Sequence, residues 1–499
     1  MTRTASAAMT AATEQELLSL LVRDDGQEDL CLAAYRPSTG ASRTTALITQ
    51  AIPPMPGDRQ VHGNVTVTDQ YILRGAEIAK QQGCGLAVLH SHPRGRGWQQ
   101  MSGPDRDAES DYANPAKAIT GHPLVGMTLA GGDLTWSARH WDTGAGRTVD
   151  CTHAESVRVV GDRLSVSWND KLDPPPPRTV RQARTISAWG PLCQADLARR
   201  RILVVGAGSV GLDVAVRLAA SGVRSLVVMD FDNVEEGNLD RLIGAAPRDA
   251  RLIRPKIHVA RRQMLAAATA ADPAIEVSDL SICEPEGLTL ALDCDLVFSC
   301  VDRPWPRAVL NSLAYTDLIP VIDGGIAIDT RADGSMCNAV WRTHVIRPGR
   351  PCMACNRQLE LGDVPIDRQG LLEDPRYIAD SGLAGTVSGE NVATLSASVS
   401  AGLLALYTSF SAAPAGRGDP RPLRYSLNTH DLEHLDYQTR PHCPVEPAEA
   451  AGDRRPALTD RHPRAEQQRQ LAASPRRGIR LLRLIDDRMQ AIAARIGRR

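Results

Sequence analysis

"RRILVVGAGSVGLDVAVRLAASGVRSLVVMDFD", residues 200–232, runs from an apolar strand through a glycine-rich turn into a helix and then a second strand. Gly206, Gly208 and Gly211 follow the first strand, where glycine permits a tight turn and lets a phosphate approach the helix N-terminus. The second strand ends at Asp230, which is placed to hydrogen-bond a ribose. This pattern predicts a nucleotide-binding βαβ unit, and by itself it favours an NAD-dependent oxidoreductase.

The same alternation of strands and helices continues on either side of this unit. "AIEVSDL", "CDLVFSCVDR" and "IPVIDGGIAID" are further apolar strands, and "TLSASVSAGLLALYTSF" has the composition of a late core helix. Strands separated by helices are typical of a doubly wound parallel sheet, so an α/β, Rossmann-like fold is expected here.

Charged and amide side chains follow the acidic strand end. "DFDNVEEGNLDRL" supplies Asn238 and Arg241, "IRPKIHVARRQ" supplies Lys256, and a later strand ends in Asp302. Cations that converge on phosphates, with a carboxylate free to hold Mg²⁺, fit phosphoryl or nucleotidyl transfer better than hydride transfer. ATP with Mg²⁺ is therefore favoured over NAD.

These motifs, in this order, resemble the ThiF/MoeB/HesA superfamily, which activates ubiquitin-like and sulfur-carrier proteins. G-x-G-x-x-G, D-x-D, N-L-x-R, P-K and C-[TV]-D are spread over roughly residues 178–445. The resemblance implies that Asp230 holds the ATP ribose and that Asp302 binds Mg²⁺. It also implies that Asn238, Arg241 and Lys256 hold the phosphates, with the two cations acting in catalysis.

The resemblance further implies a reaction and an assembly. The C-terminal glycine carboxylate of a small β-grasp protein would attack the α-phosphate of ATP, giving an acyl-adenylate and pyrophosphate. No strong base is needed, because a carboxylate is already ionised at pH 7. "VRQARTISAWG" resembles the segment from which an arginine reaches the ATP of the partner subunit, so Arg181 implies a homodimer.

A second chemical motif is "VLHSHPRGRGWQQMSGPD", residues 88–105. His90 and His92 alternate at the end of an apolar strand, so both imidazoles face the same side. Asp105 returns in the following loop and completes a His, His, Asp set, which suits Zn²⁺ with one position left for water. Bound Zn²⁺ lowers the pKa of that water towards about 7, which makes it a nucleophile at neutral pH.

"HSHP" and "SGPD" resemble the JAMM (JAB/MPN) metalloprotease motif, in which an upstream Glu precedes H-[ST]-H-P and S-x-x-D. The resemblance implies that the two histidines and the aspartate bind zinc, that Ser102 stabilises the oxyanion and that Glu28 is the upstream acid. Glu77 is the rival acid, but it lies within a helix. JAMM domains have a cytidine-deaminase-like α+β fold and cleave isopeptide or peptide bonds next to ubiquitin-like proteins. The loop before Ser102 has nine residues, where the usual pattern has seven.

Composition along the chain predicts four segments. Residues 1–170 are expected to form the α+β JAMM domain, with an opening helix at "EQELLSLLV" and a later helix whose N-cap is Asp69. Four prolines within 171–180 predict a stiff linker. Residues 178–445 form the adenylation domain. The Arg-rich tail, 446–499, is expected to end in an amphipathic helix, because apolar residues between 479 and 496 recur at helical spacing.

Three cysteines suggest a second zinc site. Cys352 and Cys355 form a C-x-x-C, the first half of a structural zinc site in many superfamily members, and "RPHCPVEP" adds Cys443. Glu446 stands where the last cysteine is expected, so the fourth ligand would be His442 or Glu446; alternatively the C-x-x-C is a reactive pair. Residues 356–442 contain no cysteine, which favours adenylation without a thioester on a family-type cysteine.

Bulk composition excludes several classes of protein. A net charge of −1 argues against a general nucleic-acid binder. The N-terminus lacks the apolar core of a secretory signal, and no run approaches about 18 apolar residues, so neither secretion nor membrane insertion is expected. The 11 cysteines show no disulfide spacing. These features predict a reduced, cytoplasmic protein.

Together the two motifs suggest a bifunctional protein of a ubiquitin-like or sulfur-carrier pathway. One half would adenylate the C-terminal glycine of a β-grasp modifier, and the other would process the modifier or remove it from conjugates. A conjugating enzyme or a sulfurtransferase would be a further partner. Three alternatives stay open: a sulfur-carrier activating enzyme for cofactor or cysteine biosynthesis, a non-catalytic modifier-binding scaffold, and the oxidoreductase.

Overall fold

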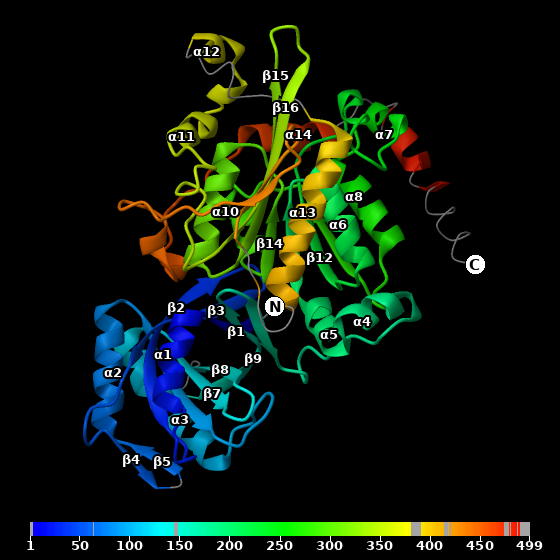
Figure 1. Cartoon of the computed structure of the whole chain (residues 1–499). Helices are drawn as coiled ribbons and strands as arrows, with labels where there is room; N and C mark the ends of the chain where they lie inside the picture. The colour runs from blue at the N-terminus through cyan, green and yellow to red at the C-terminus, as the bar shows by residue number, and fades with distance from the viewer. Residues whose placement is uncertain are drawn as a thin grey trace.

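The chain folds around two eight-stranded sheets, each covered by its own helices (Figure 1). The computed structural model describes residues 3–62, 64–143, 148–380, 391–413, 418, 421–473, 479, 481–486 and 488–489. A small two-stranded sheet, β4 (Arg59–His62) with β5 (Asn64–Val67), lies at the far end of the N-terminal half.

The N-terminal sheet closes on itself, because its first strand pairs with both the second and the seventh strand in the order. That first strand, β1, was not expected from the sequence, which predicts a helix as the first element. The order along the sheet is β1 (Thr4–Thr10), β3 (Arg43–Ile52), β2 (Leu30–Thr39), β6 (Gly85–His92), β7 (Leu124–Ala130), β8 (Thr135–Thr143), β9 (Val149–Val160) and β10 (Leu164–Trp168).

Both faces of this sheet are buried. Alternate residues of β2 show this: Cys31 and Ala33 pack with α1 (Ala11–Leu21), whereas Leu32 packs with α2 (Asp69–Gln81) and α3 (Gly103–Thr120). Thr68, not Asp69, is the N-cap of α2, since its side chain accepts from the third residue along. The S-x-x-D segment is also helical rather than a loop, because α3 begins directly after Ser102.

The C-terminal sheet is doubly wound, which confirms the expected Rossmann-like fold. Its order is β13 (Ala274–Ser278), β12 (Ser225–Met229), β11 (Arg201–Val205), β14 (Leu296–Ser299), β15 (Val321–Thr330), β16 (Met336–Ile346), β17 (Leu423–Ser426) and β18 (Leu432–His434). The strands from β13 to β15 are parallel and the rest antiparallel. One face packs on α6 (Ser209–Ala220), α8 (Lys256–Ala267) and α13 (Ala393–Ala412), and the other on α9 (Pro285–Ala291) and α10 (Pro304–Thr316).

Helix α13 is long and apolar enough by composition to cross a membrane, with a mean hydropathy of 1.3. It packs instead on α6, β15 and β16, and the Leu403 side chain fills the space beside Gly324 of β15. These contacts fit the core helix expected from the sequence.

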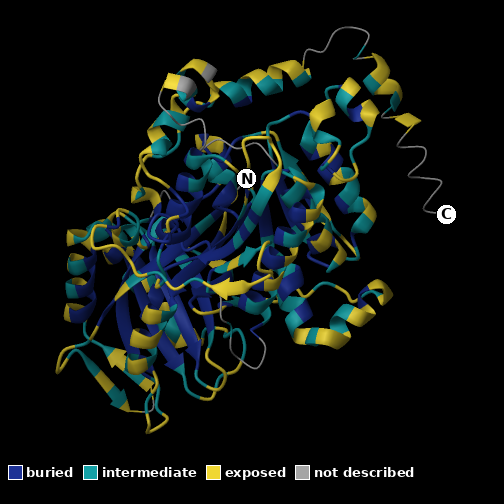
Figure 2. Cartoon of the chain, turned by 45° about the horizontal axis from the view of Figure 1, so that its top comes forward, coloured by how far each residue is buried: buried dark blue, intermediate teal, exposed yellow. Residues whose placement is uncertain are grey.

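The two halves share a buried junction. Leu47 and Val160 of the N-terminal sheet belong to the same apolar core as Ile202 and Leu226 of the other sheet. Figure 2 shows buried residues running through the strands of both halves. Ion pairs also cross the junction, since Asp295 accepts hydrogen bonds from Arg43 and Arg158 of the N-terminal half.

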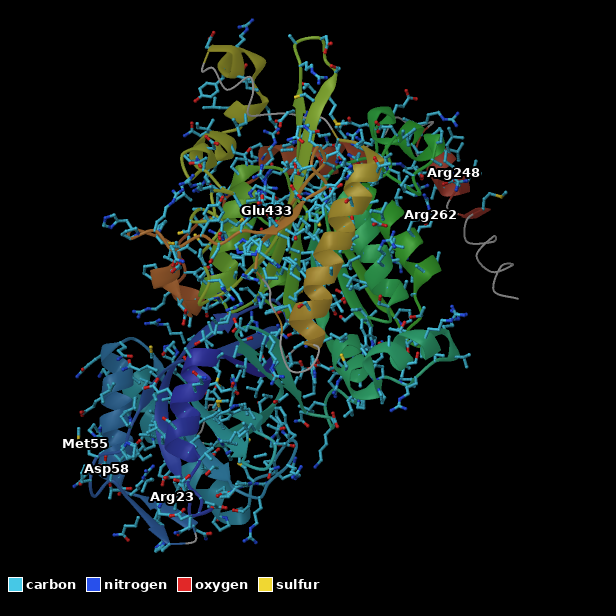
Figure 3. All side chains as sticks on the ribbon, in the orientation of Figure 1. Arg23, Met55, Asp58, Arg248, Arg262 and Glu433 are labelled. Carbon is cyan, nitrogen blue, oxygen red and sulfur yellow. The ribbon has the colours of Figure 1, made fainter. Side chains whose placement is uncertain are left out.

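The segment after residue 445 returns over both halves. Asp453 accepts from the hydroxyl of Thr39 at 2.6 Å, and Arg455 donates to Asp317 at 2.6 Å. Helix α14 (Pro463–Ala473) then lies against the C-terminal half (Figure 1). Further on, Asp486 lies 3.6 Å from Arg248, which is labelled in Figure 3.

The predicted amphipathic helix at the chain end is only partly within the described residues. Residues 481–486 and 488–489 are helical, whereas 490–499 lie outside the described part. The apolar side chains in this stretch are more than half exposed: Leu481, Leu482, Leu484, Ile485 and Met489.

Candidate active sites

The glycine-rich turn has the conformation that the sequence predicts. Gly206 has a φ of +96°, and a Cβ there would lie 2.5 Å from the carbonyl oxygen of Cys300. A Cβ on Gly211 would lie 1.9 Å from the Gly206 carbonyl oxygen. Neither position accepts a side chain. Gly208 caps α6 and faces open space, where an anion would meet the helix N-terminus.

A cavity of about 980 Å³ opens beside this turn and gathers the predicted nucleotide-binding side chains. The Asp230 carboxylate accepts from the backbone N–H groups of Ala207 at 2.6 Å and Asp232 at 2.7 Å. Burial raises the pKa of Asp230, and the positive charge of Lys256 opposes that rise. The predicted residues that line the cavity are Gly206, Gly208, Asp230, Asn238, Arg241, Lys256 and Asp302.

The cations of the cavity are held by its own polar groups. Lys256 Nζ lies 2.9 Å from Asp232 Oδ2. Burial lowers the pKa of Lys256, but the carboxylates of Asp230 and Asp232 outweigh it, so its pKa is raised and the amine stays charged. Arg241 donates to the carbonyl oxygen of Gly237 at 2.7 Å. Because a carboxylate already neutralises Lys256, an incoming phosphate would replace that partner rather than meet a bare charge.

Arg181 does not line this cavity. It is exposed in a short 3-10 turn, Val180–Gln182, and the neighbouring Thr179 bonds to Thr269 beyond the C-terminal end of α8. Within one chain it is therefore absent from the nucleotide site, and its predicted role requires a second subunit.

Residues of the C-terminal segment also line the cavity, and no sequence motif predicts this. His462 stacks on Trp305 with ring centroids 5.1 Å apart and planes 3° apart. His462, Pro463, Arg464 and Gln467 all face the cavity. The sequence of this segment is charged and has few apolar residues, as is typical of a solvent-exposed helix. Only the tertiary structure therefore shows that these residues lie at the cavity.

The N-terminal half holds a second set of converging side chains. His90 Nε2 and His92 Nε2 are 3.3 Å apart, and each lies 3.7 Å from Asp105 Oδ2. Ligands of a tetrahedral zinc ion, at about 2.0–2.1 Å from the metal, stand about 3.4 Å from one another. The triangle of donor atoms therefore has the size that Zn²⁺ requires, and these residues fit the metal.

The surroundings orient these donors. His92 Nδ1 lies 3.1 Å from Gln99 Oε1, so the ring donates there, and this contact turns Nε2 towards Asp105 and His90. Burial, with the nearby charge of Arg139, lowers the pKa of His90 to about 3, which keeps it neutral as a metal ligand must be. The contact with His92 lowers the pKa of Asp105, which keeps it ionised.

The two expected catalytic residues of this half lie beside the triangle. The Asp29 backbone N–H donates to Ser91 Oγ at 3.0 Å, and the Ser91 N–H donates to the Asp29 carbonyl at 2.9 Å. This pairing holds Glu28 near the histidine strand. Partial burial raises the pKa of Glu28, and the charges of His92 and Asp105 also act on it. Glu77 is instead exposed on α2.

Ser102 has a structural role in the chain as it stands. Its hydroxyl accepts from the N–H of Asp105 at 3.2 Å, and the Asp105 carboxylate accepts from the N–H of Ser102 at 3.0 Å. This capping box fixes the carboxylate at the start of α3. Ser102 therefore positions the third donor, and the predicted oxyanion role would come in addition.

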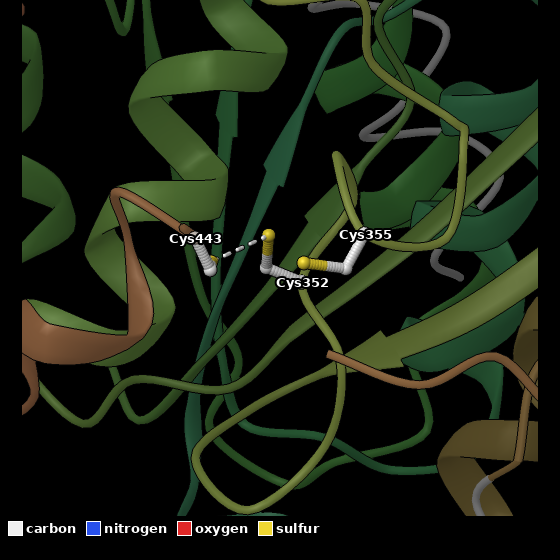
Figure 4. Close-up of side chains that lie close together, drawn as sticks. All are labelled: Cys352, Cys355 and Cys443. Atoms are coloured by element: carbon white, nitrogen blue, oxygen red, sulfur yellow. Dashed lines mark hydrogen bonds between the residues drawn. The ribbon is translucent and has the colours of Figure 1, made fainter. Parts of the chain in front are cut away.

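The three predicted zinc cysteines also converge (Figure 4). Cys352 Sγ and Cys443 Sγ are 3.6 Å apart, and all three sulfur atoms lie within 4.8 Å of one another. Burial raises the pKa of Cys352 to about 12. Among the described residues, the group contains these thiols and neither His442 nor Glu446. Glu446 Oε1 accepts from the Thr439 hydroxyl at 2.8 Å.

The C-terminal half is similar in sequence to a known protein family. A family profile described as "ThiF family" matches residues 179–445. Molybdopterin-synthase adenylyltransferase of Escherichia coli K12 is 29% identical over 168 residues, which is 33% of this chain and 62% of that protein. The SAMP-activating enzyme E1 of Haloferax volcanii is 28% identical over 259 residues, 51% of this chain and 83% of that protein.

Two further likenesses are more distant. The sulfur carrier protein ThiS adenylyltransferase of Bacillus subtilis is 26% identical over 185 residues, 37% of this chain and 52% of that protein. A crystal structure of E. coli MccB matches with a TM-score of 0.41 and 20% identity, over 54% of this chain and 75% of that one. The chain spans less than two thirds of the length of the E. coli adenylyltransferase that it matches.

Proposed function

Since the chain belongs to the ThiF family over residues 179–445, we propose that it is an ATP-dependent adenylyltransferase acting on the C-terminal carboxylate of a β-grasp protein. The observation that carries the proposal is the single cavity beside the glycine turn. It combines an acid at the ribose position with cations for phosphates and a further carboxylate, Asp302, for Mg²⁺.

The proposed reaction needs positioning and charge neutralisation rather than a base. An oxygen of the glycine carboxylate forms a bond to the α-phosphorus of ATP, and the bond from that phosphorus to the bridging oxygen breaks. The electron pair leaves with pyrophosphate, and the acyl-adenylate stays behind. Lys256 and Arg241 would stabilise the negative charge that builds up on the phosphate oxygens. Mg²⁺ held at Asp302 would supply further neutralisation.

Exchange of labelled pyrophosphate into ATP tests the proposal. The full-length protein is incubated with ATP, Mg²⁺ and small β-grasp proteins that end in glycine, and an adenylate of the added protein is sought by mass. Exchange that depends on the terminal glycine is expected. Absence of exchange with every such protein, together with tight binding of NAD, would instead favour the oxidoreductase.

A second activity is favoured by the donor triangle of the N-terminal half. We propose that His90, His92 and Asp105 hold Zn²⁺ in a JAMM-type isopeptidase site. Bound zinc would supply Lewis-acid activation of water. Glu28 would take the proton from the attacking water and pass it to the leaving amine, a task for which its raised pKa is suited.

Metal content and cleavage together test this second activity. Wild-type protein should bind zinc at this site and cleave a β-grasp protein extended or conjugated at its terminal glycine. Asp105→Ala should lose the metal, Glu28→Gln should keep the metal but lose cleavage, and Glu77→Gln should match wild type. Protein that binds no zinc here points to the non-catalytic scaffold, and full cleavage by Glu28→Gln contradicts the assignment of the acid.

We propose that Cys352, Cys355 and Cys443 hold a separate structural zinc ion. The 3.6 Å separation of two sulfur atoms is close to the spacing of about 3.8 Å between thiolates on one tetrahedral zinc. Wild type would then carry two zinc ions, and Cys443→Ser one. If wild type carries only one zinc ion and Cys443→Ser still carries one, the three cysteines do not bind zinc. Cys352 and Cys355 would then be a reactive pair.

The partner classes and the assembly complete the proposal. The sulfur-carrier alternative differs from modifier conjugation only in the protein that receives the activated terminus, so the identity of the downstream partner separates them. The exposed position of Arg181 is compatible with a homodimer in which it reaches the neighbouring nucleotide. Sedimentation of the full chain with ATP tests that assembly, and a monomer under turnover conditions would exclude it.

A further inference from the structure

We propose that Arg464, which lies outside the region matched by the ThiF family, binds the phosphates of ATP in the adenylation cavity. The C-terminal segment would thus supply a nucleotide-contacting side chain in addition to Lys256 and Arg241. This inference rests on the proposed function and adds a residue to the same site.

The first support is position. Arg464 is the second residue of α14 and lines the cavity beside Asp232. One of its nitrogens lies 3.3 Å from Asp232 Oδ1, while Lys256 holds Asp232 Oδ2 at 2.9 Å. Two cationic side chains therefore meet on one carboxylate. A phosphate within reach of Lys256 would also be within reach of Arg464.

The second support is the anchoring of α14. Arg469 makes two hydrogen bonds, of 2.9 and 2.6 Å, with the Glu284 carboxylate, and Asn233 donates to Gln468 Oε1 at 2.6 Å. Ala465 is fully buried, and His462 stacks on Trp305 just before the helix. These contacts fix α14 against the C-terminal half with its first residues lining the cavity, so Arg464 is held in place rather than carried on a free tail.

The third support is the way Arg464 is partnered. Its two terminal nitrogens are divided between Asp232 and Glu373 Oε1, the latter at 3.0 Å, and its side chain is 37% exposed. The guanidinium therefore makes single contacts with two carboxylates, although its planar fork is suited to paired contacts with one anion. A triphosphate offers that geometry and a higher charge than either carboxylate. The negative charge of Asp302 also acts on Arg464, which helps keep its pKa raised even though burial lowers it.

The same segment provides a matched control. Arg461 is three residues earlier and pairs with Glu466, but its side chain is 75% exposed and does not line the cavity. Removal of either arginine takes one positive charge from the same stretch. A difference between the two variants therefore reports position rather than net charge.

Calorimetric titration of full-length protein with Mg²⁺–ATP and, separately, with adenosine tests the inference. We expect Arg464→Ala to weaken ATP binding roughly 10- to 100-fold, the range for loss of a charge-assisted hydrogen bond, and to leave adenosine binding unchanged. Arg464→Lys should fall between, because it keeps the charge without the fork. Arg461→Ala should bind both ligands as wild type does.

Two results would overturn the inference while leaving the adenylation proposal intact. One is ATP binding by Arg464→Ala that equals wild type. The other is an equal loss of ATP and adenosine binding, which would mean that Arg464 only supports the cavity wall. Failure of wild type to bind ATP would instead refute both proposals, so the two kinds of failure are distinguishable.

Discussion

The two candidate sites differ in how much of their working geometry is already assembled by the protein alone. In the N-terminal half, three donor atoms lie 3.3–3.7 Å apart and face one point. In the C-terminal cavity, Lys256 and Arg464 are bound to Asp232 and Glu373. A small ion would enter a formed site, whereas a nucleotide would first have to exchange partners with the side chains that receive it.

The difference follows from the size of the ligand. The donor triangle of His90, His92 and Asp105 needs only a few atoms at the end of one strand and the start of one helix, so β6 and the capping box at Ser102 determine its geometry. The nucleotide cavity draws side chains from the glycine turn, from α8, from the end of β14 and from α14. The larger site depends on several elements that are far apart in the sequence and pack together. The contribution of each side chain can therefore be tested by substituting that side chain alone.

The largest expected effect concerns the junction between the two halves. Asp295 accepts from Arg43 at 2.7 Å, from Arg158 at 3.2 Å and from the Arg201 N–H at 2.9 Å, and its side chain is 2% exposed. Asp295→Asn removes the ion-pair partner that two buried arginines share and should lower the free energy of unfolding by about 3–5 kcal/mol. Urea denaturation, followed separately by ATP binding and zinc content, measures the loss.

The control for this variant is an exposed pair. Asp213→Asn removes the partner of Arg217 on the surface of α6 and should change stability by about 0.5 kcal/mol or less. If Asp295→Asn unfolds like that control, or if only one of the two sites is lost, the halves are less dependent on their junction than its burial indicates.

The next effect should separate the two sites. Lys256→Ala removes a cation from the nucleotide cavity, and we expect it to slow adenylate formation by about 10²–10³-fold. The zinc content of the N-terminal half should not change. Pyrophosphate exchange and metal analysis on the same preparation give both values, with exposed Lys80→Ala as the control. A parallel loss of zinc would show that the sites are coupled.

A smaller effect tests whether neighbouring side chains hold the donor triangle of the N-terminal half in place. Gln99→Ala removes the acceptor for His92 Nδ1, so the imidazole can turn away from Asp105. The affinity for zinc should fall about 10- to 100-fold, as for other supporting hydrogen bonds to metal ligands. Competition with a zinc-binding dye measures it, and exposed Gln100→Ala is the neighbouring control. Equal affinities in both variants would mean that the strand alone orients the ring.

The smallest effect is a dependence on pH. Burial raises the pKa of Asp295, but the positive charges of Arg43 and Arg158 lower it by more than burial raises it. The net shift of the pKa is therefore downward. A depressed carboxyl pKa stabilises the fold above the unfolded-state value of about 3.9, and that contribution disappears as the pH falls through the folded value. The stability gap between wild type and Asp295→Asn should therefore be flat from pH 7 to about pH 5 and shrink below about pH 4. A gap that widens on acidification would contradict this sign.

Local motifs could be predicted from the sequence where neighbouring residues determine the structure. The turn with Gly206 and Gly211 is set by backbone contacts within a few residues and at the adjacent strand. The pair His90 and His92 follows from strand alternation. The order of strand β11, helix α6 and strand β12 could also be predicted, because neighbouring residues within 200–232 determine each of these elements.

The features that could not be predicted depend on distant partners. Strand β1, "TASAAMT", has small and polar side chains, yet it is buried because β3 and β9 flank it. Helix α3 begins within "SGPD", directly after Ser102, although the glycine and proline of this motif are also typical of a loop. Arg464 and Arg469 find their partners Asp232 and Glu284 about two hundred residues earlier, and no local pattern encodes such contacts.

The closure of the N-terminal sheet by the pairing of β1 with β9 also has a consequence for biosynthesis. Ala8 of β1 pairs with Leu47 of β3 and with Arg158 of β9. On the ribosome β1 can therefore pair with β3 soon after both are synthesised, but it must wait for β9 until nearly the whole N-terminal half has been made. Until then the unpaired edge of β1 is open to solvent and to chaperones, and residues 90–105 are synthesised before β9 closes the sheet.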